Sequence, residues 1–213
     1  MKAILFDLDG TITDPALGIT NSVAFALNKF DIHIKDKMEL YKFIGPPLID
    51  SFMEFYHFSK EQAKQAVVFY REYFAEKGIL ENTVYQGIED MLKTLICSGM
   101  RLCIATSKPE SFAKTILEYF KLSKYFEYIA GATFDETRSK KSEVIEYALE
   151  QCKFTDRKRV VMVGDRKHDI LGAEKCSIDS IGVLFGYGSR VELEKAGATY
   201  IAEKVEDILK LII

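Results

Sequence analysis

Two aspartates near the N-terminus, Asp7 and Asp9, have the spacing that most directly suggests chemistry. They follow the apolar run 3–6, which is short and bounded enough to be a buried parallel strand, and Gly10 behind them lets the backbone turn. Two carboxylates ~4 Å apart repel by about 4 kcal/mol at an effective dielectric constant of ~20, so a cation is expected beside them. The pattern indicates a divalent metal next to an aspartate nucleophile. The alternative is an ordinary Asp-Gly turn at a strand end.

Two more apolar runs, 102–105 and 160–163, also end in polar residues. In an open α/β sheet, ligands bind beyond the carboxyl ends of the parallel strands. We therefore expect the polar residues after these runs to lie near Asp7 and Asp9, and they are Thr106, Ser107, Asp165 and Asp169.

These segments resemble, in order, the four motifs of the haloacid dehalogenase superfamily of phosphohydrolases. The first is Asp-x-Asp-Gly-Thr at 7–11, and the second is an apolar strand that ends in Thr106 or Ser107. The third is a lone lysine, here among 140–141, and the fourth is Gly-Asp-x-x-x-Asp at 164–169. The resemblance spans Met1 to about Ile213.

The resemblance implies a role for each matched residue. Asp7 would be the nucleophile that forms an aspartyl-phosphate, and Asp9 would protonate the leaving alcohol and later activate water. Thr106 and Ser107, before a helix that starts near Pro109, would bind the phosphate together with a lysine; helix N-termini are natural phosphate sites. The resemblance favours Lys141 over the competing Lys140 for that lysine, because family members commonly show Arg-x-x-Lys-x-x-Val-Ile, matched here by 138–145.

Oxygen-only ligands and a phosphate substrate favour Mg²⁺ over zinc. The resemblance assigns the metal site to Asp7 and Asp165, with the backbone carbonyl of Asp9. Asp169, one helical turn beyond Asp165, would orient a metal-bound water or a neighbouring ligand; its alternative role is that of a helix N-terminal residue.

The chain pattern changes twice. From Pro15 to Asn82, apolar residues recur at helical spacing, as in Ile19, Val23 and Leu27, whereas strands and helices alternate afterwards. Alternating strands and helices predict an α/β fold with a doubly wound, parallel, Rossmann-like sheet. We expect residues 1–14 and 83–213 to form the catalytic core, and residues 15–82 to form an inserted all-helical cap. In the resembling family, such a cap selects the substrate.

Composition narrows the class of protein. The chain has 213 residues, 48% of them hydrophobic, and a formal net charge of −3, which gives no electrostatic reason to bind nucleic acid. No apolar stretch of 18 residues and no signal peptide is recognisable, so we expect a cytoplasmic protein without membrane association. We expect it to act on a small phosphorylated metabolite as a monomer or homodimer.

The resulting hypothesis is a Mg²⁺-dependent phosphatase for a small phosphomonoester, similar to phosphoglycolate phosphatases. Three alternatives are a 5'-nucleotidase, a β-phosphoglucomutase-like phosphotransferase and, in another class, a phosphate-sensing receiver or non-catalytic binding protein. Mutases usually carry a histidine in the first cap helix, and the stretch 18–22 has none. Receiver domains have a phosphoacceptor in mid-chain, whereas Asp7 lies near the N-terminus of this sequence.

Overall fold

The computed structural model describes residues 2–135 and 137–213, and it divides the chain into two compact units. One unit comprises 1–14 and 84–213, and the other comprises 15–83. Thr83 therefore groups with the helical unit, one residue beyond the predicted boundary. Met1, the first residue of the predicted core, lies outside the described residues.

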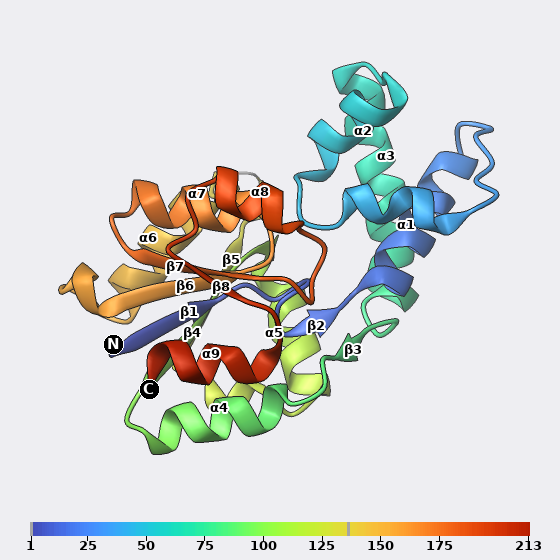
Figure 1. Ribbon diagram of the computed structural model, residues 1–213. Coiled ribbons are helices and arrows are strands. Elements are labelled where there is room, and N and C mark those ends of the chain that lie inside the picture. The colour runs from blue at the N-terminus through green and yellow to red at the C-terminus, as the bar shows by residue number, and fades with distance from the viewer. Residues whose placement is uncertain (1, 136) are drawn as a thin grey trace. The chain divides into compact units, whose positions relative to one another are not determined.

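The first unit is built on a parallel sheet (Figure 1). Among the described residues the sheet has six strands, in the order β5-β4-β1-β6-β7-β8. Their bounds are β1 Ala3–Phe6, β4 Arg101–Pro109, β5 Tyr128–Ala132, β6 Val160–Gly164, β7 Asp179–Val183 and β8 Tyr200–Ala202. The predicted α/β class is confirmed.

Helices cover both faces of this sheet. Figure 1 shows α6 and α7 on one side, with α4 and α9 on the other. The helices of this unit are α4 Ile88–Cys97, α5 Glu110–Tyr119, α6 Lys141–Gln151, α7 Lys167–Lys175, α8 Arg190–Lys195 and α9 Val205–Ile212, with short turns η3 Ser123–Tyr125 and η4 Arg157–Arg159. Helix α7 begins at Lys167, so Asp169 lies in its first turn.

Strand β1 is buried along its whole length, because it lies in the middle of the sheet and is covered on both faces. Its side chains alternate between the faces: Leu5 packs in a cluster with Val144 and Met162, while Phe6 meets Phe126 at 6.4 Å between ring centroids. The same cluster holds the Cys103 thiol, which is buried and forms no disulfide.

The second unit consists of helices joined by loops, and its last residue, Thr83, belongs to a short strand. It contains α1 Ala16–Asn28, η1 Lys37–Phe43, α2 Leu48–Tyr56, α3 Lys60–Tyr73 and the π-helical turn η2 Phe74–Gly78. Short strands β2 (Thr13–Asp14) and β3 (Thr83–Val84) mark where the chain leaves the α/β unit and returns. None of the described helices is both long and apolar enough to cross a membrane.

An aromatic cluster forms the interior of part of the helical unit. Phe43 is fully buried, and its ring centroid lies 5.0 Å from that of Phe52 and 5.4 Å from that of Phe55. Ile44 is also fully buried. Beyond these two buried residues, Pro47 is exposed and Gly45, Pro46 and Leu48, the first residue of α2, are half-buried.

Candidate active site

The register of the central strands brings the predicted site residues to one edge. Phe6 of β1 pairs with Ile104 of β4 on one side and with Val163 of β6 on the other. Because all three strands run in the same direction, their next residues emerge together at the carboxyl edge. The Asp7 N–H continues the ladder by donating to the Val163 carbonyl at 2.9 Å, so the Asp7 backbone is fixed by the sheet.

Lys141 lies between two carboxylates. Its Nζ is 2.9 Å from Asp7 Oδ1 and 2.8 Å from Asp169 Oδ1, and it donates to the Ala105 carbonyl at 3.1 Å. Burial acts to lower the pKa of Lys141, but the charges of Asp169 and Asp7 outweigh it and raise that pKa above its usual range. The ammonium therefore stays charged. Lys140, the competing candidate, has a side chain that is 78% exposed.

Two aspartates of the fourth motif lie beside Asp7. Asp169 Oδ2 accepts a hydrogen bond from the Arg166 N–H at 3.0 Å, which places this carboxylate across the start of α7. Asp169 therefore caps the helix and also pairs with Lys141. Burial raises the pKa of Asp169 to about 6, against the opposing charge of Lys141. The pKa of Asp165 lies well above its ordinary value, because it is buried and faces Asp169 and Asp7.

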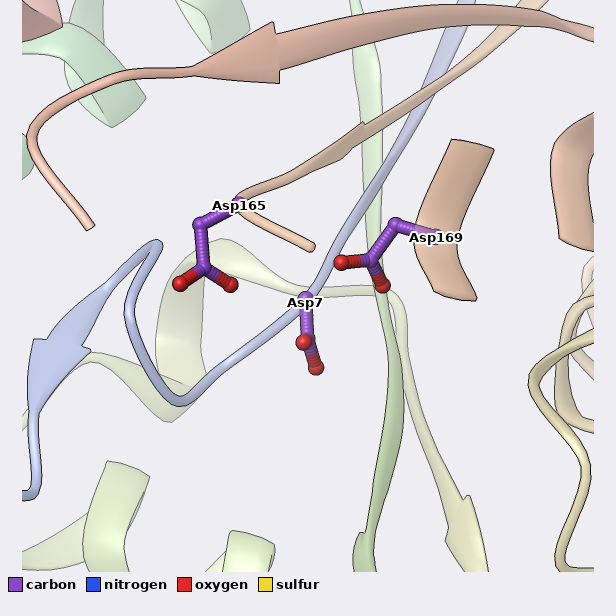
Figure 2. A group of neighbouring side chains, drawn as sticks. All are labelled: Asp7, Asp165 and Asp169. Atoms are coloured by element: carbon purple, nitrogen blue, oxygen red, sulfur yellow. The ribbon is translucent and has the colours of Figure 1, made fainter. Parts of the chain in front are cut away.

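These three carboxylates can hold a metal ion. One oxygen from each of Asp7, Asp165 and Asp169 lies within 4.8 Å of the others, and Figure 2 shows that they come from a strand end, the end of β6 and the first turn of α7. Asp165 Oδ1 is buried and has no hydrogen-bond partner among the described residues. Three buried carboxylates facing one ammonium leave an excess of negative charge. A hard divalent cation such as Mg²⁺ fits this set of oxygen donors.

The Asp9 side chain is held apart from the acidic group by a second lysine. Lys108 Nζ lies 2.8 Å from Asp9 Oδ2, and both side chains are nearly buried. Burial raises the pKa of Asp9, and Lys108 partly opposes this effect. Asp9 can therefore hold a proton at a higher pH than an exposed aspartate. The part predicted for the Asp9 backbone carbonyl, as a metal ligand, stays a prediction.

Lys108 is the site residue that sequence reasoning missed. It directly follows Thr106 and Ser107, so a cation at the end of the apolar run 102–105 was the available signal. The pairing could not be read from the sequence, because Asp9 and Lys108 meet only when β1 and β4 are aligned.

Thr106 and Ser107 lie in the last part of β4, where the pairing with β5 becomes irregular between Ala105 and Pro109. Thr106 is buried, and its Oγ1 accepts the Lys108 N–H at 3.3 Å. The hydroxyl proton of Thr106 remains available for donation. The N-cap of the next helix, α5, is Pro109, so Ser107 lies two residues before the N-cap.

Comparison with known proteins gives the family. Residues 4–183 match the family described as haloacid dehalogenase-like hydrolase. A crystal structure described as a predicted phosphatase from Clostridium acetobutylicum is 50% identical, has a TM-score of 0.95 and covers 99% of this chain and 97% of its own. The chain belongs to the haloacid dehalogenase-like hydrolases, and it is a phosphatase of that family, as the four motifs predicted.

Relatives of this chain have different names. A protein of Pseudomonas aeruginosa named 5'-nucleotidase is 44% identical over 197 residues, which cover 92% of this chain and 89% of the relative. Tyrosine-protein kinase PtkA of Mycobacterium tuberculosis is 37% identical over 200 residues, 94% of this chain and 68% of the relative. A phosphoglycolate phosphatase of Colwellia psychrerythraea is 25% identical over 221 residues, 98% of this chain and 95% of the relative. These names agree on phosphoryl chemistry and differ in substrate.

Proposed function

We propose that the protein is a Mg²⁺-dependent phosphatase that hydrolyses a small phosphomonoester through a phosphorylated Asp7. The observation that carries this proposal is the group formed by Asp7, Asp165, Asp169 and Lys141, which combines a fixed carboxylate nucleophile with oxygen donors and a permanent cation. Phosphoryl transfer depends chiefly on such positioning and on charge neutralisation.

In the first step, a carboxylate oxygen of Asp7 attacks phosphorus while the bond from phosphorus to the ester oxygen breaks. Protonated Asp9 gives its proton to that leaving oxygen, so the alcohol departs neutral. Lys141 and the hydroxyl groups of Thr106 and Ser107 hold the non-bridging phosphate oxygens.

In the second step, Asp9 takes a proton from a water molecule as the water attacks the phosphorus of aspartyl-phosphate. The bond between phosphorus and Asp7 breaks, which releases inorganic phosphate and restores the Asp7 carboxylate. When bound by Asp7 and Asp165, with Asp169 beside them, Mg²⁺ supplies positive charge that lowers the repulsion between the carboxylate nucleophile and the phosphate.

For the substrate class, a nucleoside 5'-monophosphate is now favoured over phosphoglycolate. The specific observation is that the relative named 5'-nucleotidase is 44% identical, whereas the one named phosphoglycolate phosphatase is 25% identical. Phosphoglycolate remains the second candidate. The free cysteines are compatible with a reducing compartment, and we keep cytoplasmic location as part of the proposal.

We propose further that the helical unit, 15–83, decides which ester is hydrolysed. The residues assigned to chemistry above all belong to the α/β unit, so the helical unit is free to vary with the leaving alcohol.

The test is phosphate release by the purified protein with Mg²⁺ from a panel of nucleoside 5'- and 3'-monophosphates, 2-phosphoglycolate and glucose 1-phosphate. Conversion of glucose 1-phosphate to its 6-phosphate isomer would indicate a mutase, and ATP-dependent labelling of an added protein would indicate a kinase. We expect hydrolysis, and preference for the 5'-monophosphates over their 3'-isomers.

Replacing Asp7 by Asn should abolish this hydrolysis, because the amide keeps the shape of the side chain but is a poor nucleophile. Far-ultraviolet circular dichroism should remain that of the parent, since Asp7 is held through its backbone. Turnover by folded Asp7→Asn at the parent rate would refute the proposed nucleophile.

A further inference from the structure

The segment Gly186-Tyr187-Gly188, three residues beyond the end of β7, packs directly on Asp165. It contains glycines, but only two of the three that a dinucleotide-binding loop needs, and nothing in the proposed reaction uses it. Gly186 and Gly188 do not have the positive φ angles that demand glycine. The reason for glycine at these two positions must therefore be space.

The space is taken by Asp165 and the first motif. A Cβ at Gly188 would lie 1.8 Å from the Asp165 carbonyl oxygen, and one at Gly186 would lie 2.3 Å from the Gly10 carbonyl oxygen and 2.4 Å from Asp165 Cβ. The nearest obstacles, the carbonyl oxygens of Asp165 and Gly10, are backbone atoms, which cannot rotate away as a flexible side chain would. The segment thus touches both the aspartate and the turn that follows Asp9.

The close approach brings one donor to the Asp165 carboxylate. The Tyr187 N–H donates to Asp165 Oδ2 at 2.8 Å, while Asp165 Oδ1 is buried without a partner among the described residues. One oxygen is therefore fixed by the backbone, and the other is left for a ligand. Asp165 is only 1% exposed, so water does not replace this donor.

The tyrosine side chain anchors the same segment. The Tyr187 hydroxyl donates to Asp14, the last residue of the α/β unit before the chain enters the helical unit. Burial and this hydrogen bond hold the pKa of Tyr187 above its usual value, so the phenol remains a neutral donor. Tyr187 thus links Asp165 to β2, through its backbone N–H on one side and its hydroxyl on the other.

We propose that 186–188 is a positioning loop for Asp165, which fixes the rotation of its carboxylate so that Oδ1 faces the oxygens of Asp7 and Asp169. The proposal rests on the metal-dependent function proposed above and adds the residues that make the metal site rigid. Groups that hydrogen-bond to a metal ligand commonly change metal affinity by 10- to 100-fold when altered.

The experiment measures Mn²⁺ binding to the metal-free full-length protein, with free Mn²⁺ followed by electron paramagnetic resonance. We expect Gly188→Ala to weaken binding by about 10- to 100-fold. Tyr187→Phe, which keeps the N–H donor but loses the anchor, should fall between Gly188→Ala and the parent. Gly197→Ala is the control for backbone strain that is not directed at Asp165: its φ of +86° disfavours alanine, but its added Cβ meets nothing within 4 Å. It should lose stability and still bind Mn²⁺ as the parent does.

Two further measurements separate positioning from general damage. Circular dichroism selects the folded variants, and Gly186→Ala replaces Gly188→Ala if the latter does not fold. In nuclear magnetic resonance spectra of the metal-free parent, the Tyr187 amide proton should shift upfield and exchange faster after Asp165→Ala, since its acceptor is lost.

The positioning role would be overturned if folded Gly186→Ala and Gly188→Ala bound Mn²⁺ with the affinity of the parent. It would also be overturned if Asp165→Ala left the Tyr187 amide signal unchanged. A parent that binds no Mn²⁺ and hydrolyses its substrate in excess chelator would instead refute the metal in the proposed function. In that case the amide signal alone decides whether the loop positions Asp165.

Discussion

Lys141 neutralises two carboxylates at once, which makes its charge important for both stability and catalysis. Asp7 and Asp169 are buried on either side of its Nζ, so removal of the cation leaves two acidic groups without compensation. We expect Lys141→Met to lose hydrolysis and to lower the free energy of unfolding by about 3 kcal/mol. This loss is at the lower end for a broken buried ion pair, because Asp169 can take up a proton and become neutral. Urea denaturation and phosphate release measure the two effects.

The neighbouring Lys140→Met is the control for this variant. Its side chain lies in solvent, so both quantities should remain within about 0.5 kcal/mol and twofold of the parent. Equal losses in the two variants would mean that the net charge of the segment matters, and not the contacts of Lys141.

The pair of Lys108 and Asp9 should control the pH dependence of the reaction. Lys108 lowers a pKa that burial raises, so its removal moves the pKa of Asp9 further upward. In Lys108→Met we expect each limb of the pH profile of kcat that reports Asp9 to move to higher pH. Steady-state rates between pH 5 and 9 measure this shift, with exposed Lys124→Met as the control. A lower kcat with an unmoved profile would exclude control of Asp9 by Lys108.

For individual residues, the sequence predicted well which side chains belong to the site, but it predicted poorly which of them contact each other. Asp7, Asp165 and Lys141 could be found because each follows an apolar run or matches a motif. Lys108 with Asp9, and Tyr187 with Asp165, could not be found, because those contacts depend on how close separate segments come in the folded chain. Close contacts between separate segments give only a weak signal in the sequence, such as glycines at positions where no turn is evident.

Among the elements, the connection between η1 and α2 is where substrate choice can be tested. Phe43 and Ile44 are buried and hold the connection in place, so only 45–48 can be exchanged without damage to the aromatic cluster. Replacing 45–48 by another four-residue sequence should change the relative kcat/KM of two phosphomonoesters by about tenfold, the effect of gaining or losing one contact group. The same assay panel as above provides the measurement.

An equal-length exchange of 33–35, a stretch that is exposed at His33 and Lys35 and half-buried at Ile34, is the control within the helical unit. It should leave the order of substrates unchanged. If both exchanges leave that order unchanged, the role of 45–48 in specificity is wrong.

The sequence predicted helices and strands where a local pattern determines them, but it predicted their first and last residues less well. Ser59 with Gln62 three residues later has the sequence of a capping box, and both of its hydrogen bonds are present at the start of α3. The predicted strand at 102–105 continues to Pro109, because pairing with β5 resumes after an irregular stretch. Long-range pairing of this kind overrides the local signal at a strand end.

For the molecule as a whole, the acidic group makes stability depend on pH and metal. The raised pKa of Asp165 means that the folded metal-free state binds more protons than the unfolded state above about pH 4. The contribution of the Asp165 carboxyl to the free energy of unfolding therefore falls as the pH rises toward its pKa in the folded state. In chelator, Asp165→Asn should unfold at a higher temperature than the parent, and the gap should be larger at pH 7.5 than at pH 5.

Mg²⁺ should reverse that order. A ligand at 100 times its dissociation constant adds about 2.7 kcal/mol to the state that binds it, and Asp165→Asn lacks one of the oxygens needed for binding. Thermal melts of both proteins with and without Mg²⁺ give the comparison. A parent that is more stable than the variant at pH 7.5 in chelator would contradict the assigned electrostatics.

The place of β1 between β4 and β6 also determines when this protein can become active during its synthesis. Strand β1 leaves the ribosome before its two neighbours, because it pairs with residues that follow about 100 and 160 positions later, as in the registers of Ala3 with Arg101 and Val160. Until β6 has emerged, the nucleophile strand lacks one of its two neighbours, and Asp165 and Asp169 are not yet available. Contacts so distant along the chain form slowly. A nascent chain that stops before residue 160 therefore contains Asp7 and Asp9 but has no completed phosphate site.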